Sequence, residues 1–343
     1  MVPLSEIVGG FYGDEGKGLV TAYLAMQDRI DAAVRSQGPQ AGHTVKYQGK
    51  DYVFRQIPSA IFNPKAQLLL AAGAYVNPKV VMEEVQKFEL FNVRKRLRID
   101  ENATVILPEH VEKEKILVSA VGSVGTGVGG AAADRAMRRP DILVRDVPEL
   151  KEYSDGVHVS EIVNDLLDER KSVLIEGAHS THLSNLHGAY PYTNAYDNTA
   201  SALLDQVGVG PKAVDNIYVI FKAFVSRVGK GPLNGELSEA EADKLGWVEH
   251  GTVSGRRRRA APFDVELAKK SVRLNTPTDI VITKLDIVYP GAAGVREYGK
   301  LPKEAKERIS YLEKELKVPI TLLKTGPELN DMIDLRKEKG TVA

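Results

Sequence analysis

Short apolar runs, bounded by turn-forming residues, recur along the chain and predict its architecture. They fall at residues 68–70, 173–175, 217–221, 280–282 and 320–323. Amphipathic stretches separate these runs, and the alternation is typical of a parallel sheet covered by helices. We therefore expect an α/β fold.

Three of the intervening segments carry helical signals. Apolar residues in 160–170 recur at the spacing of one helix face. Ser238 and Glu241 have the spacing of a capping box, which predicts that a short helix begins there. Residues 301–317 predict a charged surface helix that ends before Pro319.

Composition and charge exclude several classes of protein. The chain has 46 basic and 46 acidic residues, so no net charge favours nucleic acid or an anionic membrane. The absence of cysteine excludes a disulfide framework, a thiolate metal site and a cysteine nucleophile. No apolar run approaches the roughly 20 residues that span a bilayer. We expect a soluble, cytoplasmic protein with neither a nucleic-acid nor a membrane partner.

No feature of the sequence divides the chain into separate parts. It contains no repeat, no low-complexity tract and no linker rich in proline or serine. We expect a single domain over residues 1–343, with long functional loops.

The most informative segment is the glycine-rich stretch 9–18, which lies between an apolar run and an apolar-rich segment. Glycine-dense turns between a strand and a helix let backbone N–H groups approach phosphate, and the helix N-terminus adds positive partial charge. Lys17 supplies a cation for the same phosphates. The common P-loop pattern requires glycine and Ser/Thr where this chain has Phe11 and Gly18.

Two acids distinguish this stretch from a simple phosphate cradle. Asp14 and Glu15 bring negative charge beside the expected phosphates, which indicates a metal ion or a proton to be moved. The alternative is a glycine-rich turn that binds no ligand. His43 lies in a segment of small residues, 40–44, and beside a phosphate loop a catalytic role is favoured over a structural one.

Three further segments carry candidate binding chemistry. A second glycine-rich loop, 122–130, precedes several arginines and suits a second anion, or is a flexible linker. Residues 251–259 end in four arginines, which either form a solvated basic run or clamp a dicarboxylate through forked guanidinium groups. In 283–286, Asp286 follows an apolar run at a position suited to accept hydrogen bonds from guanine, with Lys284 packing along the base.

The residues alone therefore predict a guanine-nucleotide enzyme with an acid–metal centre, a histidine, a second anion site and an arginine clamp for a carboxylate. In this order, the segments resemble the adenylosuccinate synthetase family, in particular its shorter archaeal form, over residues 7–335. The resemblance implies a single α/β domain around a large, mostly parallel central sheet with flanking helices, active as a homodimer. It also implies a GTP-dependent carbon–nitrogen ligase that joins L-aspartate to the 6-position of IMP through a 6-phosphoryl intermediate, with Mg²⁺ as cofactor.

The resemblance also implies roles for individual residues. Asp14 would take the proton from purine N1 and, with the backbone carbonyl of Gly42, ligate Mg²⁺, while His43 would stabilise the transferred phosphoryl group and act as an acid. GTP would be held by Glu15, Gly16, Lys17, Gly18, Lys284, Asp286, Lys324, Thr325 and Gly326. Aspartate would be held by Thr252, Val253, Ser254, Gly255, Arg256 and Arg258. The purine monophosphate would be held by Gln40, Ala41, Val124, Arg138, His179, Asn194 and Arg256, with Arg138 reaching across the dimer.

Departures from the family pattern concentrate on the purine monophosphate. The family usually has Asn, Thr, Gln and Thr where this chain has Gln40, Val124, His179 and Asn194. We hypothesise that the reaction is kept and the acceptor is changed, with GMP or dGMP as the alternative to IMP and a 2-aminoadenylosuccinate as product. Asp14 favours IMP, because we expect a serine at that position in the related phage enzymes that use the 2-amino purine.

Other readings remain open at this stage. An acceptor with no purine is one of them. A GTP-binding regulatory protein that has lost catalysis would need guanine recognition, but it would not need Asp14, His43 and the arginine clamp. A P-loop kinase is disfavoured by the missing Ser/Thr after Lys17.

Overall fold

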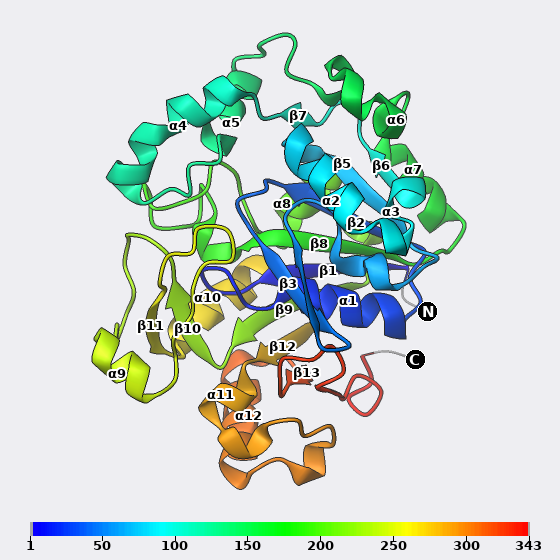
Figure 1. Ribbon diagram of the computed structural model, residues 1–343. Helices are drawn as coiled ribbons and strands as arrows, with labels where there is room; N and C mark the ends of the chain where they lie inside the picture. The colour runs from blue at the N-terminus through cyan, green and yellow to red at the C-terminus, as the bar shows by residue number, and fades with distance from the viewer. Residues whose placement is uncertain (1–2, 342–343) are drawn as a thin grey trace.

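A ten-stranded sheet runs through the centre of the protein (Figure 1). The computed structural model describes residues 3–341, so residues 1–2 and 342–343 of the expected domain lie outside the described residues. The strand order is β14-β13-β12-β9-β1-β8-β2-β5-β6, with β7 paired to β5. The strands of this sheet are β1 Leu4–Gly9, β2 Ala32–Gln37, β5 Gln67–Val76, β6 Leu97–Ile99, β7 Thr104–Val105, β8 Val173–Ser180, β9 Asn216–Lys222, β12 Asp279–Thr283, β13 Ile320–Lys324 and β14 Met332–Asp334.

The predicted α/β architecture is confirmed. All five apolar runs lie in strands of this sheet, and neighbouring strands are parallel except β13 and β14, which are antiparallel. Successive side chains of a strand face opposite sides, so a strand covered on both sides reads as a continuous apolar run. In β12, Ile280 and Ile282 join the apolar core on one face, whereas Val281 joins the core on the other.

Helices cover both faces of the sheet. α1 and α2 pack in the core that contains Val281, and α7, α8, α10 and α12 pack in the opposite one. The helices are α1 Lys17–Gln27, α2 Pro78–Lys87, α3 Val93–Arg96, α4 Pro108–Val121, α5 Val128–Ala136, α6 Lys151–Ser154, α7 Val159–Asp168, α8 Ala200–Val207, α9 Glu239–Lys244, α10 Val265–Asn275, α11 Leu285–Val288 and α12 Lys303–Leu316.

The three predicted helices are α7, α9 and α12. The predicted capping box opens α9, because the Ser238 hydroxyl accepts from the Glu241 N–H while the Glu241 carboxylate accepts from the Ser238 N–H. The expected glycine-rich loop at 122–130 is shorter than predicted. Its last three residues already belong to α5, which packs against α4 so closely at Gly130 that a Cβ there would lie 2.9 Å from the backbone of His110.

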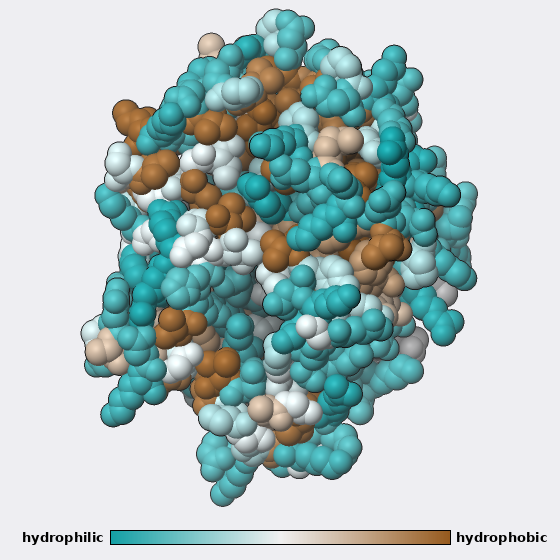
Figure 2. Space-filling model, in the orientation of Figure 1, coloured by the Kyte–Doolittle hydropathy of each residue, from teal (hydrophilic) through white to brown (hydrophobic). Residues whose placement is uncertain are grey.

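Two hairpins lie outside the sheet, β3 His43–Tyr47 with β4 Lys50–Phe54 and β10 Phe224–Arg227 with β11 Arg259–Pro262. In the orientation of Figure 1, α4 and α5 stand above the second hairpin, at the upper left. The surface seen in Figure 2 is largely hydrophilic, with hydrophobic patches in the region of α4. Within residues 3–341, no helix has the length and apolar character needed to cross a membrane.

The first turn of α1 packs closely against β3. A Cβ added to Gly18 would lie 2.5 Å from the Cβ of His43 and 2.7 Å from the hydroxyl of Ser59. Real Cβ atoms do not approach other heavy atoms so closely, so only glycine fits here without displacement of His43. This contact explains why the chain lacks the Ser/Thr of the common P-loop.

Substitution of Gly18 by serine will therefore destabilise the fold. We expect G18S to lower the free energy of unfolding by about 1–3 kcal/mol through overpacking, measured by urea denaturation. Gly129→Ala is the matched control, because its added Cβ would make only an ordinary contact, 3.6 Å from Leu117. That variant should be neutral or more stable by about 0.4–1 kcal/mol. Equal stability of the two variants would contradict the packing argument.

Candidate functional site

A cleft of about 920 Å³ opens at the carboxyl edge of the central sheet. Its walls come from segments that follow β1, β2, β8, β12 and β13, together with the turn between α4 and α5 and the loop 251–258. Ligands of open parallel sheets bind at this edge, since the strand ends present many loops to one place. The volume suits ligands of nucleotide size.

The loop after β1 is shaped from inside by a buried carboxylate. Glu15 is fully buried and accepts from the backbone N–H groups of Phe11 (3.1 Å) and Gly13 (2.8 Å). It also pairs with the Lys17 ammonium at 2.7 Å and accepts from the Ser180 hydroxyl at 2.7 Å. Burial raises the pKa of Glu15, but Lys17 and the hydrogen bonds outweigh it and bring the pKa to about 2. Glu15 thus holds both the loop and the lysine in place.

His43 is fixed by a second buried carboxylate. Its Nδ1 lies 2.5 Å from Oε1 of Glu176, and its Nε2 lies 3.3 Å from the carbonyl of Ala178. Glu176 also accepts from the N–H and the hydroxyl of Ser59, each at 2.7 Å. Burial, and then the guanidinium of Arg35, lower the pKa of His43, so in this structure the imidazole is neutral and donates its Nδ1–H to Glu176.

The side chains of the four consecutive arginines point alternately into the cleft and away from it. Arg256 and Arg258 line the cleft, whereas Arg257 pairs with Asp243 (2.6 Å) and Arg259 pairs with Glu236 (2.9 Å) outside it. Extended backbone alternates the direction of its side chains, and this accounts for the division. The arginines are therefore not a uniform solvated run, and only Arg256 and Arg258 are placed where they can meet a ligand.

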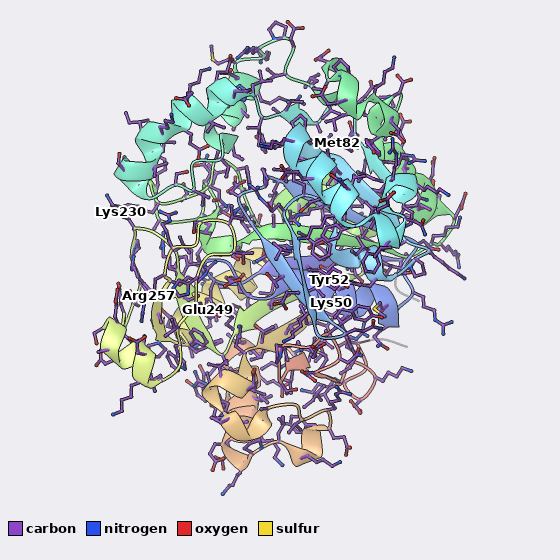
Figure 3. All side chains as sticks on the ribbon, in the orientation of Figure 1. Lys50, Tyr52, Met82, Lys230, Glu249 and Arg257 are labelled. Atoms are coloured by element: carbon purple, nitrogen blue, oxygen red, sulfur yellow. The ribbon has the colours of Figure 1, made fainter. Side chains whose placement is uncertain are left out.

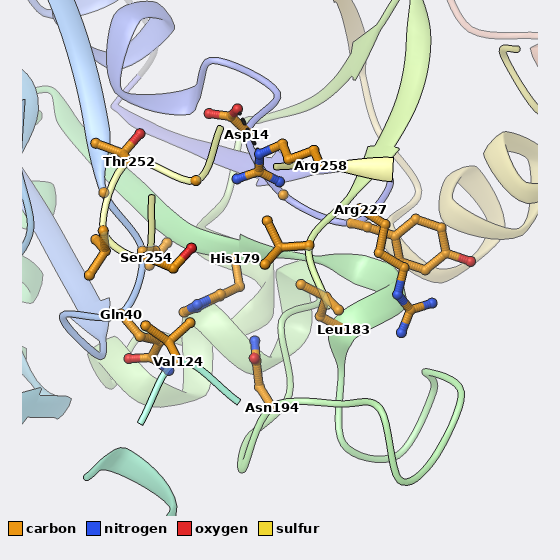
Figure 4. A pocket seen from close by; sticks show the side chains of 18 of the residues that line it. Asp14, Gln40, Val124, His179, Leu183, Asn194, Arg227, Thr252, Ser254 and Arg258 are labelled. Carbon is orange, nitrogen blue, oxygen red and sulfur yellow. Dashed lines mark ion pairs between the residues drawn. The ribbon is translucent and has the colours of Figure 1, made fainter. Parts of the chain in front are cut away.

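Two charged contacts tie the arginine loop to other walls of the cleft. The carboxylate of Asp14 forms an ion pair with Nε of Arg258 at 3.1 Å (Figure 4). Arg256 donates to the carbonyl of Gly122 at 2.9 Å, which joins this loop to the turn between α4 and α5. The candidate proton acceptor, the candidate aspartate clamp and the second glycine-rich segment are thereby connected.

A buried ion pair lies beneath the loop 251–258. Lys222 pairs with Glu249, whose carboxylate also accepts from the Ser226 hydroxyl at 2.9 Å and lies 3.4 Å from the ammonium of Lys284. Burial raises the pKa of Glu249, but the two lysines lower it by more than burial raises it, so the carboxylate is charged. Figure 3 shows Glu249 beside Arg257, near β10 and β11. Glu249 thus links the loop to the segment expected to recognise guanine.

Most of the predicted site residues line this one cleft. They are Asp14, Glu15, Gly16, Lys17, Gly18, Gln40, Ala41, Gly42, His43, Val124, His179, Asn194, Thr252, Val253, Ser254, Arg256, Arg258, Lys284, Asp286, Lys324 and Gly326. Gln40, Val124, His179 and Asn194, the four departures from the family pattern, gather in one part of it (Figure 4).

Three predicted residues lie outside the lining. Gly255 is exposed at a turn, with a φ of +65° that favours glycine. The hydroxyl of Thr325 donates to the carbonyl of Val295 at 2.7 Å, so it supports the loop from behind. Arg138 is exposed beside Arg135, in a shallow depression away from the cleft.

Several residues that shape the site were missed from the sequence. Glu176 and Glu249 each carry a buried charge that positions a cleft residue. Glu176 opens the segment 176–182 that contains His179, but its role was not predicted, and Glu249 belongs to no recognisable motif. Arg227 lines the cleft, and its guanidinium lies 4.3 Å from the ring centroid of Tyr12. A carboxylate directly after an apolar strand run was a usable signal for Glu176, whereas the partners of Glu249 cannot be inferred from spacing.

Two places in the described residues offer metal-ligand atoms. Asp14 and Gly42 border the cleft and present a carboxylate and a backbone carbonyl, the oxygen donors that Mg²⁺ prefers. The second place, Glu109, His110 and Asp134, lies away from it. There the carboxylates already pair with Arg139 and Lys113, so cations of the protein neutralise that group.

The chain is similar to a protein-family profile and to archaeal proteins that carry the same description. The family profile described as adenylosuccinate synthetase matches residues 6–158 and 147–291. The adenylosuccinate synthetase of Thermococcus sibiricus is 44% identical over 98% of this chain and 99% of its own length. That of Methanocaldococcus jannaschii is 45% identical over 97% and 96%, respectively.

Two solved structures share the fold. A fully ligated adenylosuccinate synthetase from Plasmodium falciparum superposes with a TM-score of 0.88 at 22% identity, covering 96% of this chain and 99% of its own. The succinoaminodeoxyadenylate synthetase of cyanophage S-2L, bound to dGMP and dATP, superposes with a TM-score of 0.83 at 24% identity, covering 99% and 98%. Because the matching profile and the archaeal relatives extend across the segments that build the cleft, this chain belongs to the adenylosuccinate synthetase family.

Proposed function

We propose that the protein is a GTP-dependent ligase that joins L-aspartate to the 6-position of a 6-oxopurine nucleoside monophosphate, with IMP as acceptor. One observation carries this proposal: a single cleft unites a phosphate loop, a carboxylate, a histidine, an arginine pair and a strand-end Lys-x-Asp segment. Family membership supports the same reaction. Each of these groups serves a different part of the reaction.

The two halves of GTP have separate binding groups. The backbone of Gly16 and Gly18 and the ammonium of Lys17 face the phosphates at the N-terminus of α1. Asp286 accepts from the N–H groups of guanine, and Lys284 packs along the base. Lys324 and Gly326, at the end of β13, complete the base site, with Thr325 supporting their loop.

Asp14 and His43 carry the chemistry in this proposal. Asp14 takes the proton from purine N1, which moves negative charge to the 6-oxygen and makes that atom the nucleophile toward the γ-phosphorus of GTP. His43 donates to the phosphoryl oxygens. An incoming phosphoryl group raises the pKa of His43, and Glu176 behind the ring stabilises the imidazolium, so the residue can hold the required proton. The 6-phosphate then leaves as aspartate attacks.

The aspartate site is the inner arginine pair. Arg256 and Arg258 offer forked donors that match a dicarboxylate, and the hydroxyls of Thr252 and Ser254 lie on the same loop. Arg258 is already charge-paired with Asp14 at 3.1 Å. Binding of a carboxylate substrate therefore exchanges one negative partner of Arg258 for another and frees Asp14 for the purine.

The oxygen donors in the cleft fit Mg²⁺. The carboxylate of Asp14 and the carbonyl of Gly42 would hold the ion together with phosphate oxygens, a ligand set typical of nucleotide-bound magnesium. When bound, the ion neutralises charge on the transferring phosphoryl group.

A second acceptor, GMP or dGMP, is favoured by the wall formed by Gln40, Val124, His179 and Asn194. The four substitutions fall where the purine monophosphate is expected, while the GTP, metal and aspartate positions are kept. Beside those positions the family pattern also changes, at Phe11 and Tyr12 and at Ala261 and Pro262. The phage relative that shares the fold was solved with dGMP. Retention of Asp14 keeps IMP as the first choice.

A homodimer is part of the proposal. The resemblance to the family implies that Arg138 acts on the monophosphate of a partner subunit, and its exposed position away from the cleft of its own chain is compatible with that role. We place the enzyme in the cytoplasm, as its substrates are cytoplasmic nucleotides. A regulatory GTP-binding protein is disfavoured, because such a protein has no use for Asp14, His43 and the inner arginine pair in one cleft.

Phosphate release from GTP tests the acceptor directly. With Mg²⁺ and L-aspartate present, we expect release with IMP and formation of adenylosuccinate, checked by mass spectrometry. Turnover with GMP or dGMP and little with IMP would instead assign the four substituted residues to a change of acceptor. Release independent of aspartate and of every purine monophosphate would contradict the ligase reaction.

Asp14 and Asp286 are predicted to separate chemistry from guanine recognition. D14N should lower kcat by about 100-fold or more, because the N1 proton loses its acceptor. D286N is the matched control, since it also removes one carboxylate charge from the cleft. It should raise the KM for GTP by roughly 10-fold through loss of hydrogen bonds to the base, with little change in kcat. Equal effects of the two variants on kcat would argue against these roles.

A further inference from the structure

Tyr196 lies behind the wall formed by Gln40, Val124, His179 and Asn194, and no motif pointed to it. Its ring stacks on that of Tyr75, with centroids 5.5 Å apart and planes 13° from parallel. Its hydroxyl contacts three polar groups: the N–H of Gly38 at 3.0 Å, Nε2 of Gln40 at 2.9 Å and Nδ1 of His179 at 3.1 Å.

The direction of these hydrogen bonds is determined by their donors. A phenol hydroxyl has one proton to donate and two lone pairs that accept. The N–H of Gly38 and the amide N–H of Gln40 can only donate, so they occupy both lone pairs. The single proton of Tyr196 is then left for Nδ1 of His179, which must accept it.

The protonation states support this arrangement. Burial raises the pKa of Tyr196, so the hydroxyl keeps its proton. Burial, followed by the charges of Lys17 and Arg35, lowers the pKa of His179 to about 3, so the imidazole is neutral. A neutral imidazole whose Nδ1 accepts carries its proton on Nε2.

The remaining nitrogen of His179 is free to meet a ligand. Among residues 3–341, Nε2 has no hydrogen-bond partner, and the ring borders the cleft. The preceding residue, Ala178, supplies the carbonyl that His43 contacts at 3.3 Å. His179 and the carbonyl that His43 contacts thus both lie near the end of β8, where that strand borders the cleft.

We propose that Tyr196 is a positioning residue that holds His179 as an Nε2–H donor, and that this donor selects a purine with an oxygen at position 6. This inference rests on the proposed function, since it assumes that His179 faces the acceptor base. A 6-oxo group accepts the hydrogen bond, whereas a 6-amino group offers its own N–H and leaves both donors unpaired. We call the hydrogen bonds from Tyr196 to His179 and from His179 to the purine the relay. IMP and GMP both carry the 6-oxo group, so the relay favours binding of either of them over AMP.

The variant that tests the relay is Tyr196→Phe, which removes only the hydroxyl. Without its donor, Nδ1 of His179 is free to carry the proton, and Nε2 loses its fixed polarity. We expect the Kd of the tighter-binding 6-oxo nucleotide, IMP or GMP, to rise about 10-fold, the effect of one lost hydrogen bond. The Kd of AMP should stay the same or fall. Tyr75→Phe is the matched control, because it removes a hydroxyl from the stacked ring without touching the relay, and both constants should stay at their wild-type values.

A second readout is independent of ligand binding. In the wild-type protein, ¹⁵N NMR of histidine side chains should show His179 as the Nε2–H tautomer, with its signals assigned by their loss in His179→Gln. In Tyr196→Phe those signals should shift toward the Nδ1–H tautomer.

An Nδ1–H tautomer in the wild-type protein would overturn the inference, even if the Phe variant failed to fold. An equal loss of affinity for IMP, GMP and AMP in Tyr196→Phe would also overturn it. If the wild-type protein bound neither IMP nor GMP, the proposed function would fail together with the selectivity, while the tautomer would still decide whether Tyr196 positions His179.

Discussion

The parallel arrangement of the central strands is the constraint on which the site depends. Parallel strands all end at one edge of the sheet. Segments that are far apart in the sequence therefore meet at that edge. β1, β2, β8, β12 and β13 deliver the phosphate loop, His43, His179, Asp286 and Lys324 to one cleft. The apolar cores on both faces of the sheet hold this edge in place. If the strands lost their parallel register, all of these groups would move apart at the same time.

Buried carboxylates then position the reactive groups at that edge. Glu15 holds Lys17, Glu176 holds His43, and Glu249 holds Lys222 beneath the loop that carries the inner arginines. A charge held by a buried partner keeps one geometry, and catalytic stabilisation depends on donors that are in place before the substrate arrives. Hydroxyls of Ser180, Ser59 and Ser226 each donate a further hydrogen bond to one of these carboxylates. The cleft is therefore preorganised by buried charges already in place before a substrate arrives.

Sequence patterns predicted the sheet and many of the cleft residues for the same reason. Apolar runs covered on both faces are visible as strands, and a motif such as 283–286 that directly follows one is expected at the carboxyl edge. Many other cleft residues, among them Gln40, Val124 and Asn194, were expected only from the resemblance to the family. Long-range partners could not be predicted in this way. Glu176 is 133 positions from His43, and Tyr196 is 156 positions from Gln40, so only the folded chain joins them. The direction of each side chain could not be predicted either. The four arginines are consecutive in the sequence, yet they alternate between the cleft and ion pairs outside it.

The central claim is that the 6-oxygen of the purine attacks GTP within this cleft, and an isotope label tests it most directly. The acceptor nucleotide is labelled with heavy oxygen at position 6 and incubated with GTP, Mg²⁺, L-aspartate and the enzyme. The account predicts that the label leaves the purine and appears in the released inorganic phosphate, in step with formation of the aspartate adduct. Label that stays on the purine, or is released to water and not to phosphate, would contradict it.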